Sequence, residues 1–242
     1  MSRRPFGASP GLGRGLLLRI SPHRRAGGCH GLARGAPRFG WIVLATLFLG
    51  AEAYGADAAA KGGIVKGTIT VAGKPTTDAV VSLEGVAPEA AKINLAALKS
   101  KKAVVDQRDM KFIPFVLPVV VGTTVEFPNN DKNWHNVFSK SDAQSFDLGL
   151  YAPGKSRSQT FDKPGIVRVL CNAHPSMEAF IVVKEHPFIA APDKRGNFRL
   201  DGVPPGKFRL QVWHPQLGAT DAGVEIVRDG EVLNINFDLK KK

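Results

Sequence analysis

Residues 167–177, which read V-R-V-L-C-N-A-H-P-S-M, decide the fold and the chemistry that we expect of this chain. Apolar residues recur at every second position from Val167, so the stretch predicts a β-strand that ends at Cys171 in a tight loop. His174 and Met177 follow within that loop. Thiolate, imidazole and thioether donors together select copper over zinc, calcium or magnesium, and two His, one Cys and a weak axial Met form a blue-copper site. The loop therefore offers three of the four ligands of such a site.

The fourth ligand must come from elsewhere in the chain. Fully extended, the six steps from Cys171 to Met177 could span about 20 Å, so the loop has to fold back for one ion to contact all three side chains. Pro175 favours this, because its ring fixes its own φ and keeps the residue before it out of the helical region. The missing ligand should be a histidine on a neighbouring strand, and His135 fits.

The residues around these ligands are similar to those of a known family. The pattern G-x-x-V-x-F-x-N precedes the pair His135-Asn136, and GKS (154–156) and TFDKPG (160–165) precede the C-x-x-H-P-x-M loop. With these features, residues 103–184 resemble the cupredoxins, the small blue copper proteins. The loop is most similar to that of amicyanin and, with a shorter loop, to that of plastocyanin.

The resemblance implies an all-β fold, a cupredoxin Greek-key β-sandwich, with one type 1 copper ion as the cofactor. It also implies that Asn136 ties the two ligand loops together and that His174 lies near the surface as the port for electrons. The copper ligands that it implies are His135, Cys171, His174 and Met177. Trp134, beside the first ligand, either screens the copper from water or packs in the ordinary way.

Sequence on both sides of this region also predicts β-strands. Strand patterns occur at 64–71, at 79–83 and, as a hairpin with an Asp229-Gly230 turn, at 224–227 and 233–239. Residues 88–102 predict a short helix or an ordered loop. The stretch G-x-F-x-L-D-G-V-P-P-G-x-F-x-L-x-V, residues 196–212, resembles the transthyretin-like regulatory β-sandwich module of carboxypeptidases. Residues 64–84 are similar to the first part of that module.

These patterns predict a nested arrangement of two sandwiches. Residues 62–100 and 186–240 would build one Ig/transthyretin-like sandwich, with the cupredoxin domain, residues 103–184, inserted between them; insertion is tolerated where chain ends lie close. The alternative is a serial arrangement, in which residues 62–184 form an extended cupredoxin. No catalytic constellation occurs in the flanking module, and we interpret His186 and His214 as structural or solvent-exposed.

The formal net charge of +12 is concentrated at the start of the chain. Residues 1–53 hold eight arginines and one acidic residue, which leaves 25 basic and 20 acidic residues elsewhere, so we expect no nucleic-acid binding. The apolar run at 41–51 is shorter than the about 20 residues of a membrane span and suits the core of a signal peptide. Residues 1–53 are therefore predicted to be a signal peptide, with small residues at 51–55 as the cleavage site.

Export would place the mature chain in the periplasm. The route is Sec or, because Ser2–Phe6 (SRRPF) resembles a twin-arginine signal, Tat. The alternative is an uncleaved leader, which would be the only contact with a membrane. Removal of the leader removes Cys29 and leaves Cys171 as the single cysteine, which then cannot form an internal disulfide. A metal-bound thiolate accounts for a lone cysteine in an oxidising compartment.

The sequence thus predicts a periplasmic type 1 (blue) copper protein that transfers single electrons between redox partner proteins, which it does not identify. We expect a monomer without enzymatic activity of its own. Two alternatives remain open: a copper storage or delivery protein with the same ligands, and a metal-free adhesion or ligand-binding β-sandwich. A membrane-tethered oxidase component is disfavoured, because the chain lacks a paired-cysteine binuclear motif.

Overall fold

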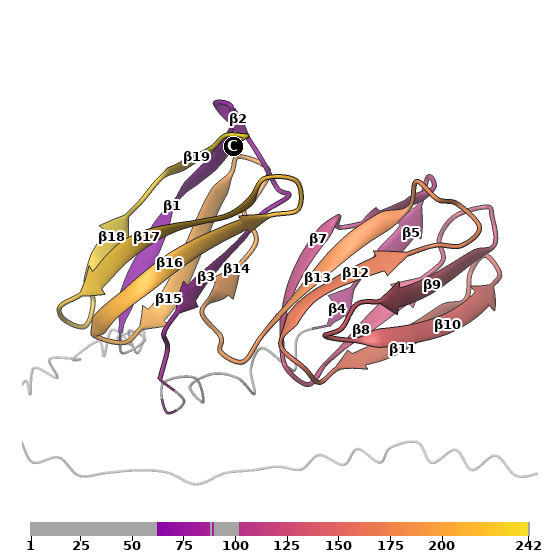
Figure 1. Ribbon diagram of the computed structural model, residues 1–242, viewed down its shortest axis with the longest axis horizontal. Coiled ribbons are helices and arrows are strands. Elements are labelled where there is room, and N and C mark those ends of the chain that lie inside the picture. The colour runs from indigo at the N-terminus through magenta and orange to yellow at the C-terminus, as the bar shows by residue number, and fades with distance from the viewer. Residues whose placement is uncertain (1–61, 88, 90–101, 242) are drawn as a thin grey trace, which may run out of the picture. The chain divides into compact units, whose positions relative to one another are not determined.

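The computed structural model describes residues 62–87, 89 and 102–241, and every element bounded within them is a β-strand (Figure 1). The chain divides into two units, Met1–Ala53 and Tyr54–Lys242, and the described residues belong to the second. The predicted signal peptide and most of the predicted helix or loop at 88–102 lie outside the described residues. Within the described part, no helix has the length and apolar character needed to cross a membrane. The all-β fold class is confirmed.

Within the part of the chain that the structure describes, ten consecutive strands pair only with one another. They form a five-stranded sheet in the order β10-β9-β12-β13-β7, a three-stranded sheet in the order β11-β8-β4, and the hairpin β5-β6. Their bounds are β4 (Ala103–Val104), β5 (Asp106–Arg108), β6 (Lys111–Ile113), β7 (Val116–Val120), β8 (Thr123–Pro128), β9 (His135–Lys140), β10 (Ser145–Tyr151), β11 (Ser156–Phe161), β12 (Gly165–Leu170) and β13 (Glu178–Lys184).

Alternation of side chains along these strands builds the core. In β12, Val167 and Val169 are fully buried while Arg168 faces solvent, as expected for a strand with one face inward. In β8, on the other sheet, Val125 and Phe127 are fully buried. Cys171 and Met177 belong to the same core cluster, so the loop after β12 is anchored in the sandwich interior.

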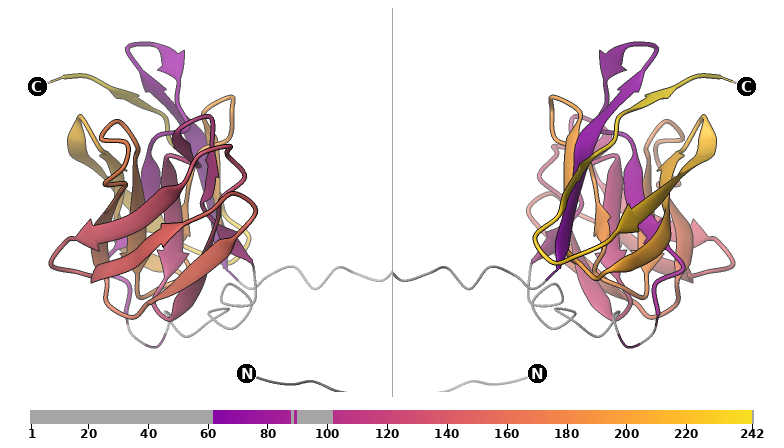
Figure 2. Two further views of the ribbon diagram at one scale, coloured as in Figure 1. Left: turned by 90° about the vertical axis from the view of Figure 1, so that its right-hand side faces the viewer. Right: turned by 90° about the vertical axis from the view of Figure 1, so that its left-hand side faces the viewer.

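A second set of strands comes from the two ends of the described chain. It forms the sheet β14-β3-β16-β17 and a sheet in which β1 pairs with β15, β18, β19 and β2; Figure 2 shows β1 beside the C-terminal β19. The bounds are β1 (Gly63–Val71), β2 (Lys74–Pro75), β3 (Val80–Glu84), β14 (Ile189–Ala190), β15 (Asn197–Val203), β16 (Gly206–His214), β17 (Gly218–Ile226), β18 (Val232–Asn234) and β19 (Phe237–Leu239).

The predicted hairpin around Asp229-Gly230 is wrong. The turn is present, with Gly230 at φ 77°, but β17 pairs with β16, whereas β18 and β19 run parallel to β1 in the other sheet. The alternating apolar residues of 233–239 face the core of this second set of strands, where Phe237 and Leu239 are buried. Burial of these side chains across two layers therefore overrides the local hairpin pattern.

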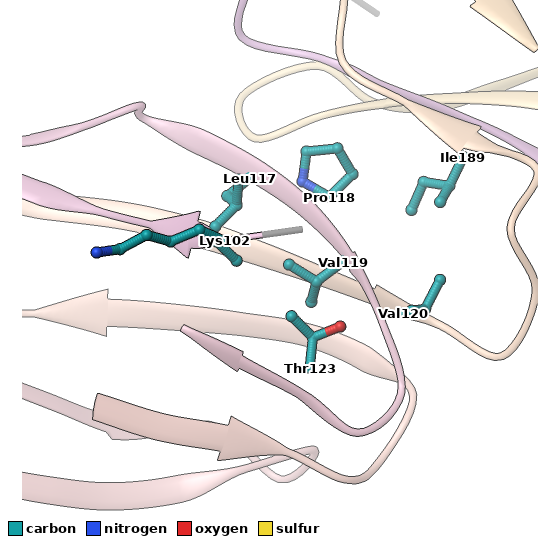
Figure 3. Close-up of a pocket in the computed structure, with 8 residues that line it drawn as sticks. Lys102, Leu117, Pro118, Val119, Val120, Thr123 and Ile189 are labelled. Atoms are coloured by element: carbon teal, nitrogen blue, oxygen red, sulfur yellow. The ribbon is translucent and has the colours of Figure 1, made fainter. Parts of the chain in front are cut away.

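The two sets of strands contact each other through a small apolar cluster. Val80 of β3 packs with Val116 and Val182 of β7 and β13, and the Trp213 ring meets the Phe180 ring edge-on at 5.5 Å between centroids. A pocket of about 200 Å³ lies nearby, lined by the residues shown in Figure 3. Thr123, in its wall, begins β8, whereas the loop to His135 follows the other end of β8. The pocket is therefore remote from the predicted ligands.

The β5–β6 turn carries local backbone strain that a substitution should relieve. Arg108 pairs with Lys111, and the two residues between them, Asp109 and Met110, have φ values of 52° and 56°. Positive φ at both central positions defines a type I′ turn, which favours Asp-Gly. Met110→Gly should raise the free energy of unfolding by about 0.5–1 kcal/mol. Glycine adopts the left-handed conformation without steric cost, and the greater entropy of the unfolded glycine chain offsets part of that gain.

Urea denaturation of the metal-free protein measures this effect. The control is the reverse change, Gly154→Ala, at φ 75° with open space around the added methyl group. It should lower the free energy of unfolding by about 1 kcal/mol. A lower denaturation midpoint for Met110→Gly than for the wild-type protein would contradict the inference that Met110 is strained.

Candidate metal centre

Two loops at one end of the five-stranded sheet bring three candidate ligands together. β12 lies beside β9, with Leu170 paired to Phe138, so Cys171 at the end of β12 comes close to His135 at the start of β9. The loop after Cys171 turns back as predicted: the Met177 N–H donates to the His174 carbonyl oxygen at 2.9 Å. Backbone pairing and this turn, rather than the side chains alone, set the positions of the ligand atoms.

The three side chains face a common point. The Nδ1 atoms of His135 and His174 are 3.0 Å apart, and the Cys171 Sγ lies 3.9 Å from the first and 4.0 Å from the second. Among the residues that the structure describes, this is the one group of three His, Cys, Asp or Glu side chains whose ligand atoms lie within 4.8 Å of one another.

These separations fit a metal ion. Metal bonds of about 2.0–2.1 Å to nitrogen and 2.3 Å to sulfur place ligand atoms on one ion about 3–4 Å apart. The donor set of two imidazoles and one thiolate is that of a trigonal copper site. His135 is fully buried and Cys171 is 4% exposed, whereas His174 is partly exposed. The site is thus closed on the protein side and reaches solvent at His174.

Met177, the fourth predicted ligand, lies in the same loop and is 1% exposed. It shares the core cluster with Cys171, in agreement with a side chain that points into the sandwich rather than to solvent. Its placement suits an axial donor supplied from the protein interior. The structure therefore brings three predicted ligands into direct proximity and buries the fourth in the core that they adjoin.

Asn136 connects the two ligand loops, as the family resemblance implied. Its Oδ1 accepts the Asn172 N–H at 2.7 Å, next to Cys171, and its Nδ2 donates to Asp147 Oδ1 at 2.9 Å. Trp134, which precedes His135, is 56% exposed and so is not part of the buried core. Its role in screening the copper stays a prediction.

Asp131 contacts the first candidate ligand and was not among the residues predicted from the sequence. Its Oδ2 lies 3.0 Å from His135 Nε2 and accepts the Met110 N–H at 2.7 Å, while Oδ1 accepts the Lys132 N–H at 2.6 Å. These bonds, led by the one from Met110, lower the pKa of Asp131 to about 2. The ionised carboxylate favours a proton on Nε2 of His135 and leaves the Nδ1 lone pair free for a metal. A carboxylate four residues before a ligand histidine was the available signal.

A buried polar network shapes the loop that carries Asp131. Asn129, fully buried, donates from Nδ2 to the carbonyl oxygens of Asn133 and Tyr151 at 2.9 and 3.2 Å, and its Oδ1 accepts the Asp131 N–H at 3.1 Å. The Tyr151 hydroxyl donates to the Phe127 carbonyl at 2.8 Å. Burial raises the pKa of Tyr151 to about 12, so it stays neutral in this network. Such bonds fix the loop and thereby the His135 ring.

Comparison with known proteins agrees with this geometry. Residues 99–184 match the model of the family described as copper binding proteins of the plastocyanin/azurin family. This part of the chain is accordingly a cupredoxin domain, of a family that binds copper. No curated protein matches the chain.

Several solved structures are similar to part of the chain. A purple cupredoxin from Nitrosopumilus maritimus is 23% identical over 34% of this chain and 100% of its own, with a TM-score of 0.32. A mutant of amicyanin in its reduced state is 27% identical over 43% of this chain and 98% of its own, with a TM-score of 0.33. A copper-containing nitrite reductase from Thermus scotoductus is 31% identical over 35% of this chain and 22% of its own, with a TM-score of 0.32.

The role of Asp131 can be tested by removing its charge alone. Asp131→Asn should lower copper affinity about ten- to a hundredfold, the usual effect of losing a partner that orients a ligand histidine. Competition with a chelator of known affinity measures it. Asp109→Asn removes the same charge from an exposed position in the adjacent turn and should leave affinity unchanged. Equal affinities for the two variants would show that Asp131 does not orient His135.

Proposed function

We propose that the chain is an exported, periplasmic type 1 copper protein that carries single electrons between redox partner proteins and transforms no substrate itself. The observation that carries the proposal is the convergence of His135, Cys171 and His174 within a cupredoxin domain. When bound, copper supplies the one-electron couple Cu(II)/Cu(I). The leader sequence supports export, and the lone cysteine supports a metal-bound thiolate.

Each proposed ligand would have its own role in an electron carrier. Cys171 as thiolate would provide the strong ligand, His135 and His174 would complete the plane, and Met177 would be the weak axial donor. His135 is held on its far side by Asp131 at 3.0 Å, and the loop backbone is held by Asn136. Ligands fixed by second partners move little when the charge of the ion changes, which favours fast transfer.

The four proposed ligands differ in their exposure to solvent. Of the four, only His174 is partly exposed; the other three are at most 4% exposed. We therefore assign His174 as the electron port. Burial of the other ligands favours retention of the ion over release, and so favours a carrier over a storage or delivery protein.

We further propose that the flanking strands form one sandwich interrupted by the cupredoxin domain. Support comes from pairing across the insertion: β1 pairs with β15, β18 and β19, and β3 pairs with β14 and β16. The likeness of this sandwich to transthyretin-like modules remains a prediction from the sequence motif. The monomeric state is likewise proposed from the sequence.

Copper uptake tests the function directly. Titration of the purified mature chain with Cu(II) should saturate at one equivalent and give an intense visible band from thiolate-to-copper charge transfer, followed by reversible one-electron voltammetry. Cys171→Ser should abolish the band, because an alcohol does not replace the thiolate. His214→Gln, at a buried histidine outside the cluster, is the control and should keep it. A wild-type protein without the band would leave the metal-free alternative standing.

The axial role of Met177 gives a separate prediction. Met177→Leu keeps the volume and apolar character of the buried side chain but removes the sulfur donor. The copper and its visible band should remain, while the midpoint potential should rise, since the weak axial ligand tunes the potential. Voltammetry measures the shift, and Met110→Leu, at a 40% exposed methionine, should leave it unchanged. Equal potentials for the two variants would contradict axial ligation.

A further inference from the structure

Two turns are hydrogen-bonded to the loop that carries His135. The β5–β6 turn is bonded to it through the Met110 N–H and Asp131 at 2.7 Å. The turn between β10 and β11 is bonded to it twice: the Asn129 N–H donates to the Lys155 carbonyl at 2.8 Å, and the Gly154 N–H donates to the Asn129 carbonyl at 2.7 Å. These hydrogen bonds hold both turns against the loop at the ligand end of the domain.

Each of these segments presents an exposed lysine. Lys111, Lys132 and Lys155 are exposed, and in the described chain none of them forms an ion pair with a carboxylate. Arg157 adds a fourth exposed cation, with its guanidinium 5.2 Å from the centre of the Tyr151 ring. The surface thus carries positive charge from several separate segments.

The acidic groups at this end do not cancel that charge. Asp106 pairs with Arg108 at 3.0 Å, and the Asp131 side chain is 8% exposed and bonded to His135 and to backbone. Asp109 is the one remaining carboxylate of these turns and faces solvent. Asp147, exposed on β10, is a second carboxylate near the ligand loops and accepts hydrogen bonds from the Asn136 amide and the Gly149 N–H. Three lysines and Arg157 therefore outnumber two exposed carboxylates, Asp109 and Asp147, that have no cationic partner within the described residues.

Exposed apolar side chains occur on the segments that carry two of these cations: Trp134 shares a loop with Lys132, and Leu150 lies in β10, which leads to the turn that holds Lys155. Trp134 is 56% exposed and Leu150 is 54% exposed. Both flank the first ligand, because Trp134 precedes His135 and Leu150 precedes Tyr151, its partner across β9 and β10. Exposed aromatic and apolar side chains surrounded by a polar rim are typical of protein-binding surfaces.

We propose that this ligand-end surface, made of Lys111, Lys132, Trp134, Leu150 and Lys155, docks an acidic patch on a protein partner. The inference rests on the proposed function, since the partner would exchange electrons through the adjoining site. The lysines steer an acidic surface toward this end, and the apolar side chains lose water on contact.

The chain provides a matched control at the other end of the domain. Ser156 pairs with Pro128 near the ligand loop, whereas Phe161 pairs with Thr123 at the far end of β8. Lys163 comes two residues after Phe161, the last residue of β11, so it lies beyond the far end of a six-residue strand of about 20 Å. It is exposed and also lacks a carboxylate partner within the described residues.

The first experiment follows electron transfer to two inorganic probes. The copper-loaded, reduced protein is mixed in a stopped-flow instrument with anionic hexacyanoferrate(III) or cationic tris(phenanthroline)cobalt(III), at about 0.01 M ionic strength, where screening is weak. Lys132→Glu and Lys155→Glu should each slow the reaction with the anion about threefold or more and speed that with the cation. Lys163→Glu gives the protein the same net charge as the other two variants, and it should change both rates less than they do. Equal effects at all three positions would overturn the proposal.

A second experiment does not depend on copper. A polyglutamate peptide is titrated into the metal-free protein, and the indole N–H signals of Trp134 and Trp213 are followed by NMR. The Trp134 signal should shift at low salt and return as salt is added, and Lys132→Glu should abolish the shift while Lys163→Glu preserves it. An unmoved Trp134 signal would overturn the docking surface. Failure of copper uptake with this shift intact would instead count against the proposed function alone.

Discussion

The constraint on which the site depends is the placement of β12 beside β9 in the five-stranded sheet. That pairing brings Cys171 Sγ within 3.9 Å of His135 Nδ1, although the two residues are 36 positions apart in the chain. Burial of a thiol and an imidazole costs free energy unless both have partners. Cys171 and Met177 pack in the sandwich core, which holds the loop between them. Asp131 Oδ2 contacts Nε2 of His135, the ring nitrogen that does not face Cys171. Removal of either support would leave the ligands free to separate.

Hydrogen bonds to the ligand loops give the centre its rigidity. Asn129 and Asn136 are nearly or fully buried side chains whose amides bond to backbone of the two loops. Asp131 joins the β5–β6 turn to the first ligand, so a strained hairpin turn and the metal site share one carboxylate. Networks of this kind stabilise a single geometry, because a rearrangement would leave buried polar groups without partners. A fixed geometry is the property that an electron carrier requires.

The flanking strands are joined to the cupredoxin strands by packing and by charge. Val80, Val116 and Val182 form an apolar contact between them, and Lys184 Nζ lies 2.6 Å from Glu84 Oε1 with both side chains 22% exposed. The contact lies at β13 and β3, away from the ligand loops.

By itself, the sequence determined the all-β class, the cupredoxin domain and the residues that converge, because the C-x-x-H-P-x-M loop and the alternation around it are local patterns. It did not determine the partner of His135: the spacing of Asp131 from His135 is a weak signal, and only the fold of the loop brings the Asp131 carboxylate to Nε2. Nor did it determine that β18 and β19 would leave the predicted hairpin to pair with β1. Both outcomes were decided by tertiary structure, because burial and hydrogen bonding between distant segments outweigh local turn preferences.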